Sequence, residues 1–178
     1  MLKHIFPHRN ILLICALLLS GCGYTFPHVY EGPHRTIYMP TWQNRTNKLG
    51  LDMKIYQSLA QWFQKSTAVS LTKEQDRADL VLTGEILSIE LPSVSWSNIQ
   101  EVTGTKVNLF VRYTLKNRAT GKVLWEVPKK LYSADYSVSA VSAAVDEEAM
   151  TKIISDLSED IYIGALKRIR KQQAQAAH

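Results

Sequence analysis

The sequence of 178 residues is long enough for one domain with a hydrophobic core and too short for two full domains. Hydrophobic residues make up 46% and charged residues 21%, which are the proportions of an ordinary globular protein. The formal net charge of +5 permits contact with phosphates or anionic surfaces, although solubility alone would also explain it. We expect no nucleic-acid partner.

The N-terminus has the pattern of a bacterial lipoprotein signal peptide. Lys3 and Arg9 precede an apolar run, Ile11–Leu19, which is far shorter than the roughly 20 residues that span a membrane as a helix. The run ends in Leu19-Ser20-Gly21-Cys22, which resembles the lipobox: small residues admit a peptidase, and the thiol receives the lipid. We therefore predict a signal peptide over residues 1–21 and lipid attachment, palmitate included, at Cys22.

Lipid attachment fixes the expected location of the chain. Several acyl chains, each contributing about 0.8 kcal/mol per buried CH2, form an essentially permanent anchor. The residue after the cysteine is Gly23 and not Asp, which favours the outer membrane over retention at the inner one. The sequence thus predicts an outer-membrane protein that is lipid-anchored on the periplasmic side, with residues 22–35 as a short tether.

The hydrophobic pattern of residues 36–172 predicts a single α+β domain. Period-two alternation or β-branched runs indicate strands at 36–40, 78–91, 106–117 and 123–136, with Pro128 marking a bulge or a sheet edge. Helical spacing begins at Leu51 and again at Met150, and residues 173–178 are expected to fray. The order β-α-β-β-β-α predicts a two-layer sandwich, with both helices on one face of a mixed sheet.

The sequence offers no catalytic or metal-binding constellation. The histidines after Cys22 are His28, His34 and His178, which lie in the tether and at the terminus, away from any cysteine or carboxylate at ligand spacing. Three acids of the 78–91 strand, Asp79, Glu85 and Glu90, are typical of a solvated face. We therefore expect no enzyme activity, no metal and no cofactor.

Trp96 differs from the other tryptophans because it lies in the connection between two predicted strands, residues 93–105. A large apolar ring at a loop tip either folds back onto its own domain or contacts a partner. Both interpretations stay open, and Trp96 is a candidate partner-contact residue.

Several stretches resemble one family of envelope proteins. "GCGYTF" at the predicted acylation site, "IYMPTWQNRT" at the start of the domain, "ADLVLTGEI" and "TGKVLWE" are similar to the lipopolysaccharide (LPS)-assembly lipoproteins of the LptE family. The resemblance implies a four-stranded sheet with two helices on one face. It also implies a non-catalytic protein that plugs the outer-membrane β-barrel LptD, helps it to assemble and binds LPS.

Contact with the phosphates of LPS calls for Lys and Arg. In the family, basic residues of strand-connecting loops are implicated, yet residues 92–105 and 134–149 contain neither Lys nor Arg. The remaining candidates are Lys106 and Arg112 on the polar face of one strand, with Lys129 and Lys130 next to Pro128. The alternative is that these four are ordinary solvated residues of the sheet.

A second class of lipoprotein also carries stretches like "ADLVLTGEI" and "TGKVLWE". Its members activate peptidoglycan synthases across the periplasm or support secretion pores. Synthase activators usually have a long linker after the cysteine, whereas here only about a dozen residues, at roughly 3.3–3.6 Å each, precede the first strand. The short tether favours a partner in the same membrane, and the missing catalytic residues disfavour a lipid-anchored hydrolase.

Overall fold

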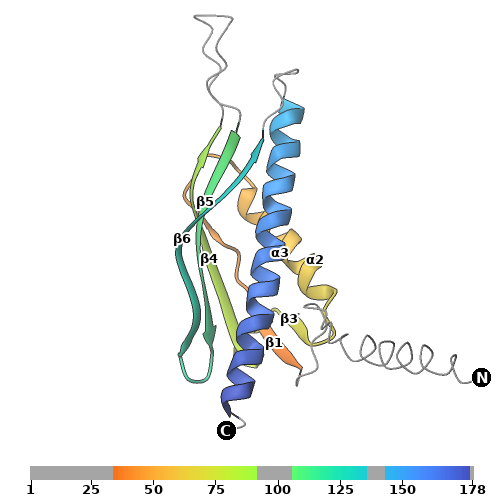
Figure 1. The fold of residues 1–178 in the computed structure, drawn as a ribbon, viewed down its shortest axis with the longest axis vertical. Coiled ribbons are helices and arrows are strands. Elements are labelled where there is room, and N and C mark those ends of the chain that lie inside the picture. Colours follow the sequence, from red (N-terminus) through yellow and green to blue (C-terminus); the bar gives the residue numbers. More distant parts are fainter. Residues whose placement is uncertain (1–33, 92–105, 136–142, 177–178) are drawn as a thin grey trace, which may run out of the picture.

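The computed structural model describes residues 34–91, 106–135 and 143–176 (Figure 1). Its elements, in chain order, are β1 (Arg35–Tyr38), β2 (Gln43–Asn44), α2 (Leu51–Gln64), β3 (Val69–Thr72), the 3-10 helix η1 (Gln75–Arg77), β4 (Leu80–Glu90), β5 (Lys106–Asn117), β6 (Val123–Asp135) and α3 (Ala143–Ala176).

The predicted α+β class, with two helices and a mixed sheet, is confirmed, but the predicted strand number was wrong. The sheet has six strands and not four, because β2 and β3 escaped the sequence analysis. β2 has two residues and β3 has four, so neither is long enough to show alternation. Both depend on pairing with other strands, β2 with β4 and β3 with β1.

The sheet combines a parallel half with an antiparallel half. Its strand order is β3-β1-β4-β5-β6, with β2 paired to β4. β1 runs parallel to both neighbours, whereas β4, β5 and β6 form antiparallel pairs. β6 is an edge strand, and its register with β5 shifts between Val111 and Tyr113, which places Pro128 in a bulge as predicted.

Both long helices lie on the same side of the sheet in Figure 1 and pack against each other. α2 begins at Leu51 as predicted, while α3 begins at Ala143, well before Met150, and continues through Ala176. The sheet surface away from both helices is called the distal face below. The core between sheet and helices contains fully buried side chains from all three: Ile55, Leu59 and Phe63 of α2, Val107, Leu109 and Val111 of β5, and Ile153, Leu157 and Ile161 of α3.

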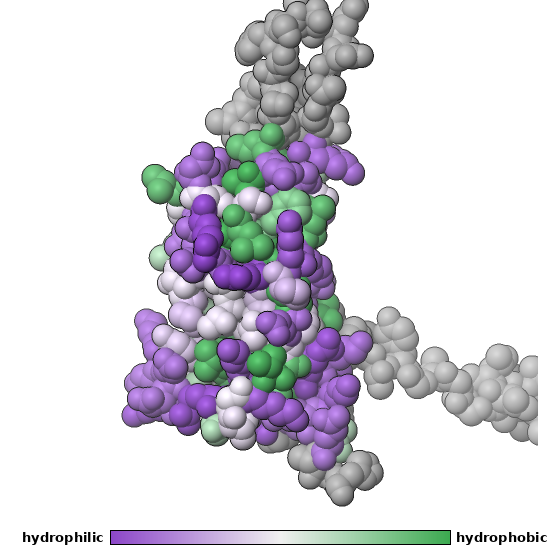
Figure 2. All heavy atoms as spheres, turned by 90° about the vertical axis from the view of Figure 1, so that its left-hand side faces the viewer, coloured by the Kyte–Doolittle hydropathy of each residue, from purple (hydrophilic) through white to green (hydrophobic). Residues whose placement is uncertain are grey.

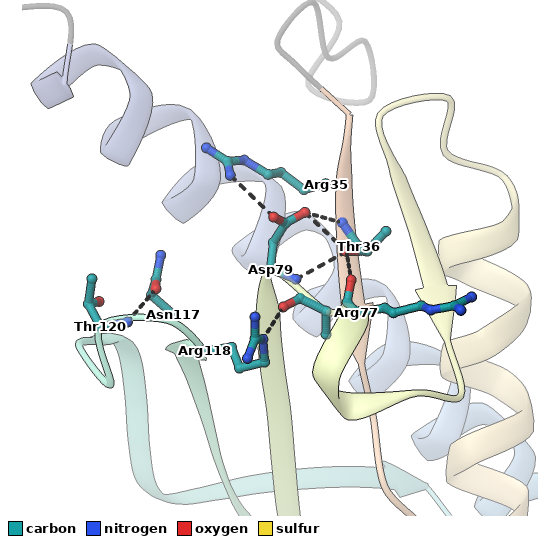
Figure 3. A network of polar contacts seen from close by, with 8 residues as sticks. Arg35, Thr36, Arg77, Asp79, Asn117, Arg118 and Thr120 are labelled. Atoms are coloured by element: carbon teal, nitrogen blue, oxygen red, sulfur yellow. Dashed lines mark hydrogen bonds and ion pairs between the residues drawn. The ribbon is translucent and has the colours of Figure 1, made fainter.

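Hydrogen bonds join β1 to the start of β4 (Figure 3). The Asp79 carboxylate accepts from the backbone N–H of Thr36 at 2.8 Å and from its hydroxyl at 3.0 Å. The backbone N–H of Asp79 donates in return to the Thr36 carbonyl at 3.0 Å. Beside them, Arg118 donates to the carbonyl of Ala78 at 2.6 Å. Asp79 therefore fastens the short strand β1 to the sheet, although its side chain is 38% exposed.

Three aromatic rings fill the core where the sheet meets α3, and two glycines make room for them. Tyr113 lies between Trp42, at 6.2 Å between ring centroids, and Trp125, at 4.9 Å. A Cβ atom on Gly84 would lie 2.1 Å from the ring of Trp42, and one on Gly164 of α3 would lie 2.2 Å from the ring of Trp125. The absence of side chains at both positions lets the tryptophans lie flat against the backbone.

Gly84→Ala should destabilise the protein by about 1–3 kcal/mol, the usual effect of overpacking a core. Gly84 does not have a positive φ, so the added contact with Trp42 is the cause and not backbone strain. Urea unfolding of the variant measures this effect. Thr83→Ala, an exposed neighbour on the distal face, is the control and should change stability little. Equal stability of the two variants would contradict this account of the packing.

Candidate functional site

The distal face is the surface on which most of the predicted basic residues lie. Along β5, Lys106, Phe110 and Arg112 alternate with the buried residues of the core, so they point away from the helices. Figure 2 shows this side of the molecule, with apolar groups in its upper half, further apolar groups lower down, and hydrophilic residues around both.

An apolar row crosses the three long strands on the distal face. Phe110 pairs directly with Leu131, which is 48% exposed. On the other side, the register of β4 shifts between Ile86 and Ser88, so that Leu87 and Ser88 both lie opposite Phe110. Leu87, Phe110 and Leu131 are therefore neighbours and are called the apolar row below.

The predicted cations on this face have different surroundings. The ammonium of Lys129 lies over the ring of Phe110, 4.5 Å from its centroid, so a cation borders the apolar row. Lys106 lies 3.8 Å from Asp135, which compensates its charge at an exposed position. Arg112 forms an ion pair with Glu85 through Nε and Nη2.

Lys130 does not join the other three basic residues. Its side chain turns toward α3, where its ammonium lies 2.6 Å from the carboxylate of Asp160. Tyr132 also donates to this carboxylate, at 2.6 Å. The four predicted cations thus form no single cluster, and Lys130 ties the sheet edge to the helix.

Arg45 is a further cation of the distal face that was not predicted from the sequence. Pairing of β2 with β4 brings this residue to the distal face. There Nε of Arg45 contacts Oε1 of Glu85, while Arg112 contacts Oε2. The side chain of Asn44 accepts from the N–H of Thr46 at 2.9 Å, which shapes the turn that carries Arg45. The motif Asn-Arg-Thr was read as a family signature, and nothing in its spacing shows that it reaches the sheet.

Glu85 was wrongly assigned to a solvated face. The residue is only 5% exposed, while the side chains of Arg45 and Arg112 on either side are 56% and 51% exposed. A carboxylate with so little access to water requires charged partners, and the two guanidinium groups supply them. Next to the apolar row, three cations, Arg45, Arg112 and Lys129, thus face two carboxylates, Glu85 and Glu90.

Two predicted site residues, Cys22 and Trp96, lie outside the described residues. Within the described ranges, no group of His, Cys, Asp and Glu could hold a metal ion. No helix in those same ranges is long and apolar enough to cross a membrane.

Comparison with known proteins identifies the family. The model of the LptE family, described as lipopolysaccharide-assembly, matches residues 35–163, from β1 into α3. The chain belongs to the LptE family. No curated protein matches the sequence. LptE membership therefore rests on the family model and connects this chain with lipopolysaccharide assembly.

Comparison with solved structures finds similar chains at low sequence identity. A protein of Xanthomonas campestris has a TM-score of 0.57 and 9% identity, over 82% of this chain and 93% of its own. A lipoprotein of Neisseria meningitidis has a TM-score of 0.43 and 8% identity, over 70% of this chain and 99% of its own. By TM-score only the likeness to the Xanthomonas protein bears on the fold, and at such identities neither likeness bears on function.

The environment of Asp160 gives a testable dependence on pH. Burial by itself would raise the pKa of this carboxyl, but hydrogen bonds from Lys130 and Tyr132 outweigh burial and lower it. A lowered pKa means that the ionised carboxylate stabilises the fold at neutral pH. This stabilisation is lost as the pH falls below the ordinary value of about 3.9 and through the lower folded value.

Asp160→Asn should therefore reduce the free energy of unfolding by about 1 kcal/mol at pH 7, since Asp160 is partly exposed and screened, and by less at pH 3. Urea unfolding at both pH values measures the difference. Asp156→Asn removes an exposed pair with Lys152 at 2.9 Å on the same helix and should change stability little. An effect of Asp160→Asn that does not depend on pH would contradict the assignment.

Proposed function

We propose that this LptE-family chain is an outer-membrane lipoprotein, anchored through Cys22 on the periplasmic side, that partners an LptD-type β-barrel and binds LPS. The observation that carries the proposal is the composition of the distal face. There the apolar row lies next to Lys129, Arg112 and Arg45. LPS combines acyl chains with phosphate groups, so a surface that offers apolar and cationic groups side by side matches both parts.

The two sides of the sheet support different parts of this proposal. The buried side forms a rigid core with α2 and α3, as a plug needs. The lumen of a large outer-membrane barrel is polar, so a small domain with a largely polar surface can occupy it. The role is non-catalytic: it consists of holding a partner and a lipid, and no step of it requires a reacting side chain.

Among the predicted cations, the structure supports unequal roles in LPS binding. Arg112 and Lys129 border the apolar row and lie within reach of one amphiphilic ligand. Lys106 forms an ion pair with Asp135, so we expect it to contribute less to LPS binding. Lys130 is engaged with Asp160 on the helix side, so we expect it to support the fold rather than contact LPS.

Recovery of the tagged, acylated protein from membranes in mild detergent, followed by mass spectrometry, tests the partner. We expect a large β-barrel of the LptD type in stoichiometric amount, and cells that express the untagged protein are the control. Recovery of a peptidoglycan synthase in place of the barrel would contradict the proposal and support the second class of lipoprotein.

Changing Arg112 and Lys129 together to Gln should weaken LPS binding about tenfold or more, because each loses a charged contact to phosphate. Binding of labelled LPS to the purified protein measures the loss. Lys73→Gln with Lys122→Gln removes the same net charge from exposed positions away from the apolar row and is the matched control. An equal loss in both double variants would show that only net charge matters and would remove the distal face from the site.

A further inference from the structure

Glu85 holds two arginines from different parts of the chain. One carboxylate oxygen contacts Arg45, which follows β2, and the other contacts Arg112 of β5. The carboxylate is nearly inaccessible, whereas both guanidinium groups reach the surface. Two positive charges thus share one negative charge, and the cluster keeps a net charge of +1.

This arrangement leaves binding capacity on both arginines. Glu85 occupies Nε of Arg45 and Nε and Nη2 of Arg112. A guanidinium group has more N–H donors than these contacts use, and its planar fork matches the oxygens of a phosphate. Because Glu85 fixes both side chains in advance, a bound anion would not have to pay the full entropy of ordering them.

A hollow of about 280 Å³ on the distal face is lined by Glu85 and by Arg112 of the pair. Its polar lining comes from Gln43, Thr83 and Thr114, together with Glu85 and Arg112. This volume lies near the lower end of the roughly 300–1,000 Å³ that is typical of small-molecule sites. Hydroxyl and amide groups beside a cation are suited to a sugar that carries a phosphate.

We propose that Glu85 is a positioning residue that holds Arg45 and Arg112 as a paired site for the phosphate of a glycosyl phosphate, whose sugar ring lies in the hollow. The inference rests on the proposed function, in which a phosphorylated sugar headgroup is the polar part of the ligand. The apolar row begins one position along β5 from Arg112 on the same face, at Phe110, so acyl chains attached to such a headgroup have an adjoining surface.

Two Glu→Gln variants separate positioning from simple electrostatics. Glu126 lies opposite Thr114 in the register, on the same face as Glu85, but is exposed. Either substitution removes one negative charge, so net charge alone predicts equal or tighter binding of an anion by both variants. Positioning predicts that Glu85→Gln binds about tenfold more weakly and that Glu126→Gln binds as well as or better than the unchanged protein.

The experiment is calorimetric titration of the full-length acylated protein in detergent with glucosamine 1-phosphate, inorganic phosphate and glucosamine. We expect glucosamine 1-phosphate to bind most tightly, and Glu85→Gln to weaken it. Arg45→Lys with Arg112→Lys keeps both positive charges but removes both planar guanidinium groups. If Glu85→Gln does not fold, this double variant should show the same loss of affinity for glucosamine 1-phosphate. Circular dichroism reports folding of each variant.

Three results would overturn the proposal: no binding of glucosamine 1-phosphate, equal binding of inorganic phosphate, or undiminished binding by both Glu85→Gln and the double lysine variant. Titration with LPS separates this proposal from the proposed function. If LPS binds and Glu85→Gln has no effect, the positioning role fails and the function stands. If glucosamine 1-phosphate binds in the expected order and LPS does not, the paired site stands and the function fails.

Discussion

The alternation of side chains along the three long strands, interrupted by three register shifts, determines what each face of the sheet carries. β5 alternates without interruption and places its aliphatic residues against the helices. β4 contains one register shift, at Leu87, and β6 contains two, one at Pro128 and one between Val123 and Trp125. Each extra residue reverses the alternation beyond it, because side chains in a strand have a period of two.

The bulges at Leu87 and Pro128 create the mixed character of the distal face. From the bulge at Pro128 onward, Lys129 and Leu131 point to the distal face while Lys130 points to α3. The bulge in β4 brings Leu87 next to Phe110, which completes the apolar row. The adjacent lysines therefore have different roles: Lys129 borders a surface that could receive a lipid, and Lys130 stabilises the contact between sheet and helix through Asp160.

Elements that depend on local sequence patterns were predicted from the sequence, whereas elements that depend on contacts between distant segments were not. Uninterrupted alternation in β5 and the apolar stripe that begins at Leu51 are local patterns, and both elements were predicted correctly. The strands β2 and β3 exist only through pairing with distant segments, so local patterns could not reveal them. Glu85 looked like one solvated acid among three, because its burial depends on Arg45, which is distant in the sequence.

The candidate site was predictable to the same limited degree. Arg112, Lys129 and Lys130 were all predicted as candidates because they are basic. The bulge at Pro128, which the composition does not reveal, turns Lys130 toward α3 and leaves Lys129 on the distal face. The family resemblance suggested LPS as the ligand, and the register of the strands shows which cations lie beside the apolar row. A charged residue on a sheet can be assigned to a site only after the register of its strand is known.

The central claim, that LPS lies on the distal face, is most directly tested by photo-crosslinking in living cells. A photoreactive amino acid at Leu131 would probe the distal face, and one at Ser155, exposed on α3, would probe the helix side. After illumination, LPS covalently bound to the protein is detected by immunoblotting. The account predicts LPS adducts from position 131 and none from position 155, and adducts from position 155 alone or from both positions equally would contradict it.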